Sequence, residues 1–147
     1  MIIDPLHVQK RQQKNIELDN VRKILRKLPK EVYRWKINDP YHGGVSDTYY
    51  SGPNNHCWIE YKYKENLPAK LNSKIKINLS EQQRIWLARQ QEHGVFTYAV
   101  FGSGDQVYVT EDFTLTHITV GTFIKEAIPF KIFVETLTKF CLGETND

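Results

Sequence analysis

The apolar and polar positions of this chain follow two periods, which together predict an α/β fold. Runs rich in β-branched and aromatic residues predict five strands. These runs lie at residues 31–38, 45–50, 57–63, 95–101 and 106–110. Apolar residues spaced by three and four predict helices at 10–28, at 79–93 and, interrupted near Pro129, at 123–142. We therefore expect a mixed central sheet flanked by helices.

A hairpin is expected at the centre of this arrangement. The runs 45–50 and 57–63 flank residues 52–55 (Gly-Pro-Asn-Asn), which favour a tight turn, so the two strands should pair antiparallel. Before the hairpin, the pair Gly43-Gly44 could bring the backbone close to a ligand or form a simple turn. After it, residues 64–76 are expected to be a polar, lysine-rich connecting loop.

The second strand of the hairpin carries candidate chemistry. Because side chains alternate along a strand, Trp58, Glu60 and Lys62 share one face. Asp47, on the partner strand, joins that face if the register puts it beside Glu60. Two acids next to a lysine form a site for a hard cation. The alternative is that Asp47 is a turn residue and that Glu60 and Lys62 belong to a solvated strand face.

The first predicted helix has one residue out of pattern. Its apolar side consists of Val21, Ile24, Leu25 and Leu28. At helical spacing Glu17 falls within about 40° of Val21, Ile24 and Leu28, so its carboxylate points toward the core side. A carboxylate in that position needs a metal or a cationic partner. The alternative is that Glu17 reaches around the helix edge to nearby lysines.

The helix at 79–93 has clear signals at both ends. Ser80 and Gln83 form the Ser-x-x-Gln pattern of a capping box, and His93-Gly94 provides the stop. Its expected buried surface consists of Ile85, Trp86, Leu87 and Ala88.

The last predicted helix has an apolar stripe that allows two interpretations. The stripe consists of Phe130, Phe133, Val134, Leu137 and Phe140. Packing against the core is one interpretation. A dimer surface is the other, because a core built from residues 10–110 would already be complete, which would make 121–142 a C-terminal helical extension.

Composition narrows the class of protein. The chain has 147 residues, of which 40% are apolar, enough for one domain with one core. A net charge of +3 suits a nucleic-acid partner without establishing one. Cys57 and Cys141 are the only cysteines and lack metal-ligand spacing, so we expect buried thiols in a reducing compartment. No run approaches the length of a membrane span, which predicts a cytoplasmic protein with no membrane partner.

The hairpin residues resemble a known nuclease core. An Asp followed about a dozen residues later by Glu-x-Lys on a hairpin strand resembles the PD-(D/E)XK nucleases, and residues 44–47 together with 58–62 resemble their VRR-NUC branch. The stretch 79–87 is similar to the motif that follows the Glu-x-Lys strand in that family. Ser46 stands where the pattern usually has proline, a residue that shapes the backbone and binds no metal.

This resemblance implies a restriction-endonuclease-like fold and a set of site residues. Asp47, Glu60 and the backbone carbonyl of Tyr61 would bind Mg²⁺, or Mn²⁺ in its place, and Lys62 would position or activate the attacking water. The resemblance also gives Gln83 a role in the site, as an alternative to its role as a helix cap. It makes Glu17 a candidate for the glutamate that an N-terminal helix often supplies.

The function implied is a Mg²⁺-dependent DNA endonuclease that leaves a 5′-phosphate and a 3′-hydroxyl. Stand-alone members of the family are small phage-type proteins that can act on Holliday junctions as dimers, so we expect a branched DNA substrate, a homodimer and, if phage-encoded, the host cytoplasm. The alternatives are a non-catalytic nucleic-acid-binding module of the same fold, a metal-dependent enzyme acting on other DNA, RNA or nucleotides, and a plain interaction domain.

Overall fold

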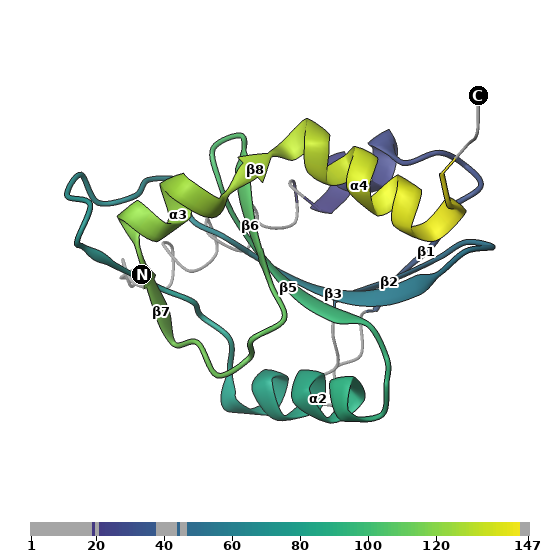
Figure 1. The fold of residues 1–147 in the computed structure, drawn as a ribbon, viewed down its shortest axis with the longest axis horizontal. Coiled ribbons are helices and arrows are strands. Elements are labelled where there is room, and N and C mark those ends of the chain that lie inside the picture. The colour runs from purple at the N-terminus through teal and green to yellow at the C-terminus, as the bar shows by residue number, and fades with distance from the viewer. Residues whose placement is uncertain (1–18, 20, 38–43, 45–46, 145–147) are drawn as a thin grey trace, which may run out of the picture.

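The computed structural model describes residues 19, 21–37, 44 and 47–144, and within them a six-stranded mixed sheet forms the centre (Figure 1). Its strands are β1 (Tyr33–Lys36), β2 (Thr48–Ser51), β3 (His56–Tyr63), β5 (Thr97–Ser103), β6 (Gln106–Thr110) and β8 (Ile128–Pro129), in the order β1-β2-β3-β5-β6-β8. β3 and β5 run parallel and are connected through helix α2 (Glu81–Glu92). The other neighbouring pairs are antiparallel. The predicted mixed sheet with flanking helices is confirmed.

A second, two-stranded sheet corrects the prediction for residues 64–76. β4 (Lys74–Lys76) pairs antiparallel with β7 (His117–Thr119), so the end of the expected loop is a strand. The buried Ile75 and Ile77 hold it against the body of the protein. A three-residue strand with lysine on both sides of one isoleucine is too short to show a period, which is why the pattern did not reveal it.

The C-terminal region also differs from the single interrupted helix that was expected. Helix α3 (Val120–Glu126) starts earlier, where Thr119 caps it by accepting a bond from the N–H of Thr122 at 3.1 Å. β8 follows and pairs with the edge of β6, and helix α4 (Phe130–Leu142) then begins directly after Pro129. Pro129 suits both the end of an edge strand and the start of a helix, because its missing N–H is not needed as a donor in either place.

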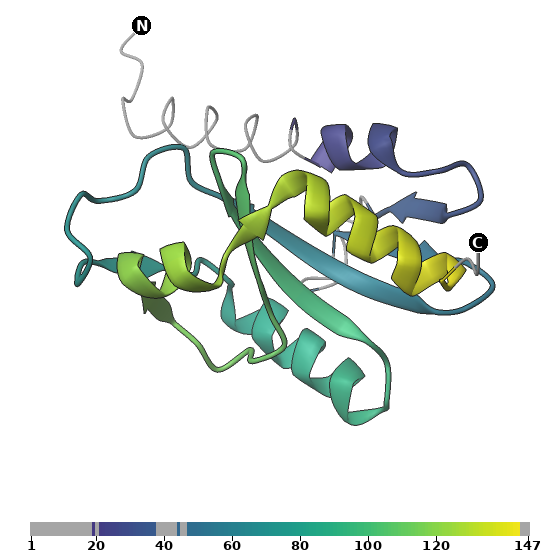
Figure 2. The same ribbon diagram turned by 45° about the horizontal axis from the view of Figure 1, so that its top comes forward.

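One face of the sheet is covered by α4 and by the helical segment at 21–27, which Figure 2 shows on the same side. The buried residues on this side form one cluster. They include Val21, Ile24 and Leu28 from the first helix, Cys57, Ile59 and Tyr61 from β3, and Phe133, Val134, Leu137 and Cys141 from α4. Because α4 supplies four of these side chains, it is part of the core, and the core is not complete at residue 110.

On the opposite face lies α2 (Figure 1), and residues of α2, the small sheet and α3 form a second buried cluster there. Leu87 is the buried residue of α2, whereas Trp86 and Ala88 are partly buried and Ile85 is 50% exposed. The expectation that all four would provide buried surface was therefore wrong for Ile85. In the part of the chain that the structure describes, no helix is long and apolar enough to cross a membrane.

Both cysteines are buried free thiols, as expected. Burial raises the pKa of Cys57 well above its usual range and raises the pKa of Cys141 to about 11. The two thiols therefore stay protonated and serve as small apolar core residues.

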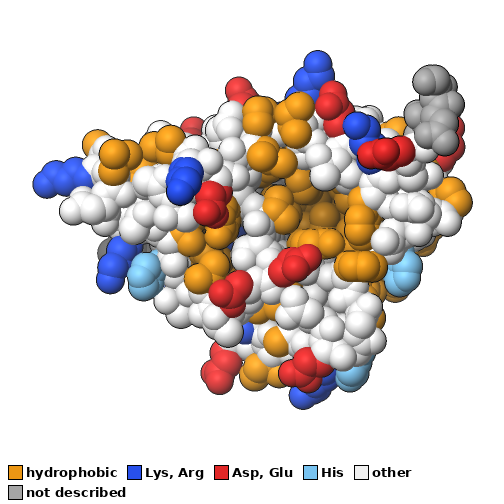
Figure 3. Space-filling model, in the orientation of Figure 1, with side chains coloured by type: hydrophobic (Ala, Val, Ile, Leu, Met, Phe, Trp, Pro, Cys, Tyr) orange, Lys and Arg blue, Asp and Glu red, His pale blue; other side chains and the backbone are white. Residues whose placement is uncertain are grey.

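An apolar hollow opens beneath α4. Figure 3 shows apolar side chains gathered there, in a depression of about 250 Å³ between α4 and the sheet. The apolar residues lining it are Cys57, Ile59, Tyr98, Val109, Ile128, Phe133, Leu137 and Phe140.

The side chain of Arg84 ties α2 to the segments around the small sheet. Its guanidinium donates to the carbonyl oxygens of Phe113 at 2.7 Å, Leu115 at 2.5 Å and Ile77 at 3.0 Å. These carbonyls belong to irregular backbone, which lacks ladder partners and must find other donors. One arginine side chain therefore supplies the hydrogen-bond donors for three backbone carbonyls.

We expect Arg84→Ala to lower the free energy of unfolding by about 1–3 kcal/mol, because it leaves partly buried carbonyls without donors. Urea denaturation of the variant measures this change. The exposed Arg89 lies on the same helix, and Arg89→Ala, the matched control, should change stability by no more than about 0.5 kcal/mol. Equal stabilities for the two variants would mean that water replaces the guanidinium without loss.

Candidate active site

The two acids of the hairpin lie at the point where the β2–β3 ladder ends. Thr48 pairs with Ile59, so Asp47 and Glu60 are the next opposed positions. At these positions carboxylates, rather than backbone carbonyls, accept the hydrogen bonds from the backbone N–H groups. The N–H of Asp47 donates to Glu60 Oε2 at 3.0 Å, and the N–H of Tyr61 donates to Asp47 Oδ2 at 3.1 Å. Each acid is thus fixed by the backbone of the opposite strand, in the register that the sequence analysis required.

Among the candidate residues that the structure describes, Glu60 is the most deeply buried, with 1% of its surface exposed. Its Oε1 accepts a bond from Gln83 Nε2 at 2.7 Å and lies 3.7 Å from Lys62 Nζ. The Lys62 side chain is 17% exposed. Lys62 therefore stands between the buried carboxylate and solvent, which is where a lysine can meet both an acid and an approaching substrate.

Gln83 serves both of the roles that the sequence analysis treated as alternatives. Its Oε1 accepts a bond from the N–H of Ser80 at 2.9 Å, and Ser80 Oγ accepts one from the N–H of Gln83 at 3.1 Å, which completes the capping box. Its Nε2 is directed at Glu60. The two contacts use opposite ends of one amide, so capping the helix does not prevent Gln83 from reaching Glu60, and the partial exclusion that the two interpretations implied does not arise.

Burial raises the pKa of the Asp47 carboxyl above its usual range. This effect outweighs the N–H of Tyr61 and the charges of Lys62 and Lys36, all of which favour the ionised form. Lys36 is a residue that the sequence analysis missed. It pairs with Thr48 in the register, next to Asp47, and only the pairing of β1 with β2 could have revealed its proximity.

The backbone conformation and the close packing at residue 44 explain why glycine stands at one of the two positions before the site. Its φ is +90°, and a Cβ atom there would lie 2.5 Å from the carbonyl oxygen of Gln82. The chain therefore packs directly onto the first turn of α2, the turn that carries Gln83. The close approach is to protein backbone, which favours the turn interpretation for Gly44. Gly43 lies outside the described residues.

The candidate residues reach the site from three places. Asp47 precedes β2, Glu60 and Lys62 lie on β3, and Gln83 lies in the first turn of α2. Tyr61 presents its backbone to Asp47, while its ring lies in the opposite core and shares a 2.8 Å hydrogen bond with the hydroxyl of Tyr50. Glu17 and Ser46 lie outside the described residues.

The donor set suits a small divalent ion. Mg²⁺ keeps several of its waters and needs only one or two protein carboxylates. Asp47 and Glu60 supply two, in adjacent positions, and burial raises the pKa of the Asp47 carboxyl, an effect that a bound cation would oppose. Among the described residues no group of three or more His, Cys, Asp or Glu side chains could hold a metal, so the set is limited to this sparse kind.

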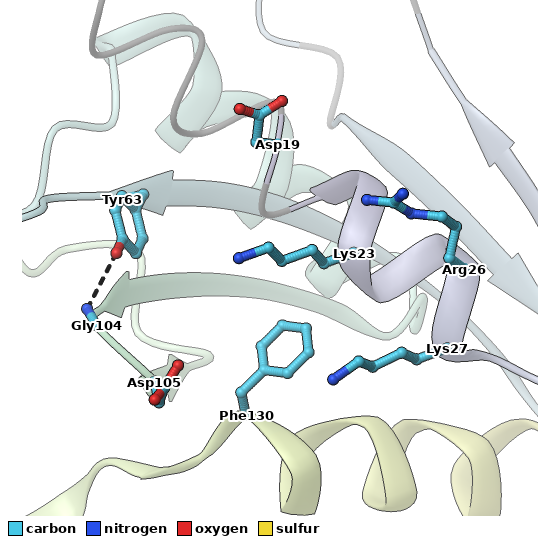
Figure 4. A pocket seen from close by; sticks show the side chains of 8 residues that line it. All are labelled: Asp19, Lys23, Arg26, Lys27, Tyr63, Gly104, Asp105 and Phe130. Carbon is cyan, nitrogen blue, oxygen red and sulfur yellow. Dashed lines mark hydrogen bonds between the residues drawn. The ribbon is translucent and has the colours of Figure 1, made fainter.

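A second hollow, lined by three basic and two acidic side chains among others, opens beside Tyr63 at the end of β3 (Figure 4). It has a volume of about 540 Å³. Its lining residues are Asp19, Lys23, Arg26, Lys27, Tyr63, Gly104, Asp105 and Phe130, and we call it the cationic hollow. Lys27 Nζ lies 5.2 Å from the centre of the Phe130 ring, and the hydroxyl of Tyr63 accepts a bond from the N–H of Gly104 at 3.1 Å.

Comparison with known proteins supports the fold. No protein-family model matches this sequence, and a search of curated proteins finds no match either. The structure of this chain is similar to a solved structure of Hjc from Archaeoglobus fulgidus, a Holliday junction resolvase from an archaeal hyperthermophile. The TM-score is 0.51 at 12% identity, over 86% of this chain and 98% of the resolvase chain. The predicted restriction-endonuclease-like fold is confirmed.

The raised pKa of Asp47 predicts how the stability of the protein changes with pH. The folded protein holds this proton more tightly than the unfolded chain does, so without metal its stability should fall as the pH rises from about 4 through the raised pKa. Asp47→Asn lacks this fall and should be the more stable protein at pH 7 in EDTA. Urea unfolding between pH 3.5 and 8 measures the difference.

Two controls accompany this experiment. Hydrogen bonds from Thr114 lower the pKa of the exposed Asp112, so Asp112→Asn should gain no stability at pH 7. Added Mg²⁺ or Mn²⁺ should stabilise the wild type and leave Asp47→Asn unchanged. An Asp47→Asn protein that is less stable than the wild type in EDTA at pH 7 would contradict the assignment of an unfavourable buried charge at Asp47.

Proposed function

We propose that this chain is a metal-dependent nuclease that hydrolyses phosphodiester bonds in DNA. The observation that carries the proposal is the cluster around Glu60, which hydrogen bonds join to Asp47 and Gln83 and an ion pair joins to Lys62. The similarity of the fold to a Holliday junction resolvase supports it. So does the resemblance of these residues to the PD-(D/E)XK pattern and its VRR-NUC branch.

The residues divide the work as follows. Asp47, Glu60 and the carbonyl of Tyr61 would hold Mg²⁺, which neutralises charge on the scissile phosphate and activates water when bound. Lys62 lies at the rim of the site, where it positions or activates the attacking water and offsets the negative charge of the transition state. Both ends of the Gln83 amide are engaged by protein groups, so we assign it as a positioning residue that orients Glu60. Glu17 remains a candidate for a further ligand.

The cationic hollow supports a nucleic-acid substrate. Lys23 and Lys27 lie four residues apart on one helix, where like charges repel each other, and Figure 4 shows both side chains extending toward the same space. Phosphates that follow the scissile bond would relieve this repulsion. Contacts of this kind supply affinity that does not depend on sequence.

Within this function we propose a branched DNA substrate and a homodimer. A four-way junction presents two equivalent strands, and two sites related by twofold symmetry can cut both. The apolar hollow beneath α4 is a candidate contact surface for the second copy. A strict monomer on junction DNA in gel filtration would count against this part of the proposal and leave the nuclease assignment intact.

We expect Lys62→Ala and Asp47→Ala to abolish cleavage and to leave DNA binding largely unchanged. The test is a labelled panel of four-way junction, flap, single-stranded and linear duplex DNA, incubated with Mg²⁺, Mn²⁺ or EDTA. Cleavage that needs the metal and is lost in Lys62→Ala would support the proposal. Retained cleavage by Lys62→Ala would refute the assigned site. A junction that is bound and never cut would favour the non-catalytic binding module.

The cationic hollow gives a separate prediction. Replacing both Lys23 and Lys27 by alanine should weaken binding of duplex DNA and reduce the slope of log affinity against log salt by about 2, because about one counterion is released for each phosphate contact. Fluorescence anisotropy over a salt series measures the slope. Lys125 on α3 is also exposed, and Lys125→Ala serves as the control with an unchanged slope.

A further inference from the structure

A row of aromatic side chains crosses three neighbouring strands beside the acid pair. Trp35 on β1 pairs with Tyr49 on β2, which pairs with Trp58 on β3. Directly opposed residues place their side chains on the same face. The ring centres of Tyr49 and Trp58 are 4.9 Å apart and those of Trp35 and Trp58 are 6.5 Å apart. We call these three residues the aromatic row.

Helix α2 closes one end of the aromatic row and leaves the other end open. Trp86 meets Trp58 edge to face, with ring centres 5.3 Å apart at 82°. At the far end, on edge strand β1, Trp35 is 54% exposed, and Tyr33 on the same face is 57% exposed. The open end therefore presents aromatic faces to solvent.

Packing alone does not account for Trp35. Cross-strand aromatic pairs contribute only modestly to stability, and a threonine or valine would suit an exposed edge strand equally well. Large aromatic side chains that remain half exposed and lie together are typical of surfaces that bind a ligand. The row needs a partner that is flat, aromatic or apolar.

The position of the row relative to the acids identifies that partner. Asp47 lies two residues before Tyr49, and Glu60 lies two residues after Trp58, so the acids form a parallel row on the same face, roughly 7 Å away. A nucleotide joins a flat base to a phosphate through one sugar. A substrate with its scissile phosphate at the acids would therefore have a neighbouring base over the aromatic row.

We propose that the aromatic row is a stacking platform for an unpaired nucleobase next to the scissile phosphate, an inference that rests on the proposed function. A base in a duplex has both faces covered by its neighbours and cannot stack on protein. The site therefore selects DNA with unpaired nucleotides, as found at gaps, flaps and open junction centres. Stacking of one base on an aromatic side chain contributes about 1–3 kcal/mol and tolerates any sequence.

The test uses the full chain in EDTA, so that binding is measured without cleavage. The probes are a duplex with a short single-stranded gap containing 2-aminopurine and the same duplex fully paired. The wild type should bind the gapped probe more tightly and quench its fluorescence. Trp35→Ala should weaken binding to the gapped probe by about tenfold and leave the paired probe unchanged. Trp35→Phe should retain most of the affinity.

A matched control lies on the other side of the sheet. Phe96 is 44% exposed, and its ring packs against Phe140 of α4. Phe96→Ala removes an aromatic side chain of similar exposure and should bind both probes as the wild type does. Equal losses on the gapped and paired probes for Trp35→Ala, or no loss on either, would overturn the proposal.

A change in the DNA keeps the test independent of folding. Abasic nucleotides in the gap should weaken wild-type binding as much as Trp35→Ala does, and should cause no further loss in that variant. Undiminished wild-type binding to the abasic gap would overturn the platform, even if the protein cleaves DNA. Base-dependent binding without any cleavage would support the platform and refute the nuclease.

Discussion

The arrangement of the site depends on how the β2–β3 ladder stops. After the Thr48–Ile59 pair, the next backbone donors bind carboxylates, with the N–H of Asp47 on Glu60 and the N–H of Tyr61 on Asp47. A carboxylate that accepts a backbone N–H is held by a charge-assisted bond, stronger than the neutral bond it replaces. The ladder therefore ends by fixing two acids side by side, and the β-sheet itself sets their spacing.

Burial is unfavourable for the charged form of Asp47, and the surrounding residues reduce this effect only in part. Lys62 and Lys36 favour ionised Asp47, yet burial still raises its pKa. A bound divalent cation would favour the ionised form of Asp47 in the same way as the two lysines do.

The parallel connection from β3 through α2 to β5 brings the remaining parts together. It places the first turn of a helix over the face that carries Glu60, where Gly44 allows the chain to approach to contact distance. The capping box then has two consequences. It starts α2 at Glu81, and it holds the Gln83 amide so that its Nε2 is directed at Glu60. Deleting the cap would change the helix start and the orientation of the acid together.

Features with a local period could be predicted from the sequence, and features that depend on assembly could not. Alternation along 57–63 placed Glu60 and Lys62 on one face, and the Ser80-Gln83 pattern located the start of α2. The short strands β4, β7 and β8 have two or three residues each, too few for any period. The role of α4 in the core was equally hidden, because an apolar stripe looks the same against a sheet and against a second protein. Lys36 near Asp47 and the carbonyl contacts of Arg84 depend on how distant segments meet. A fold shared with a resolvase at 12% identity makes the same point, because the topology constrains where strands end and helices begin and leaves the residues at those positions to determine the chemistry.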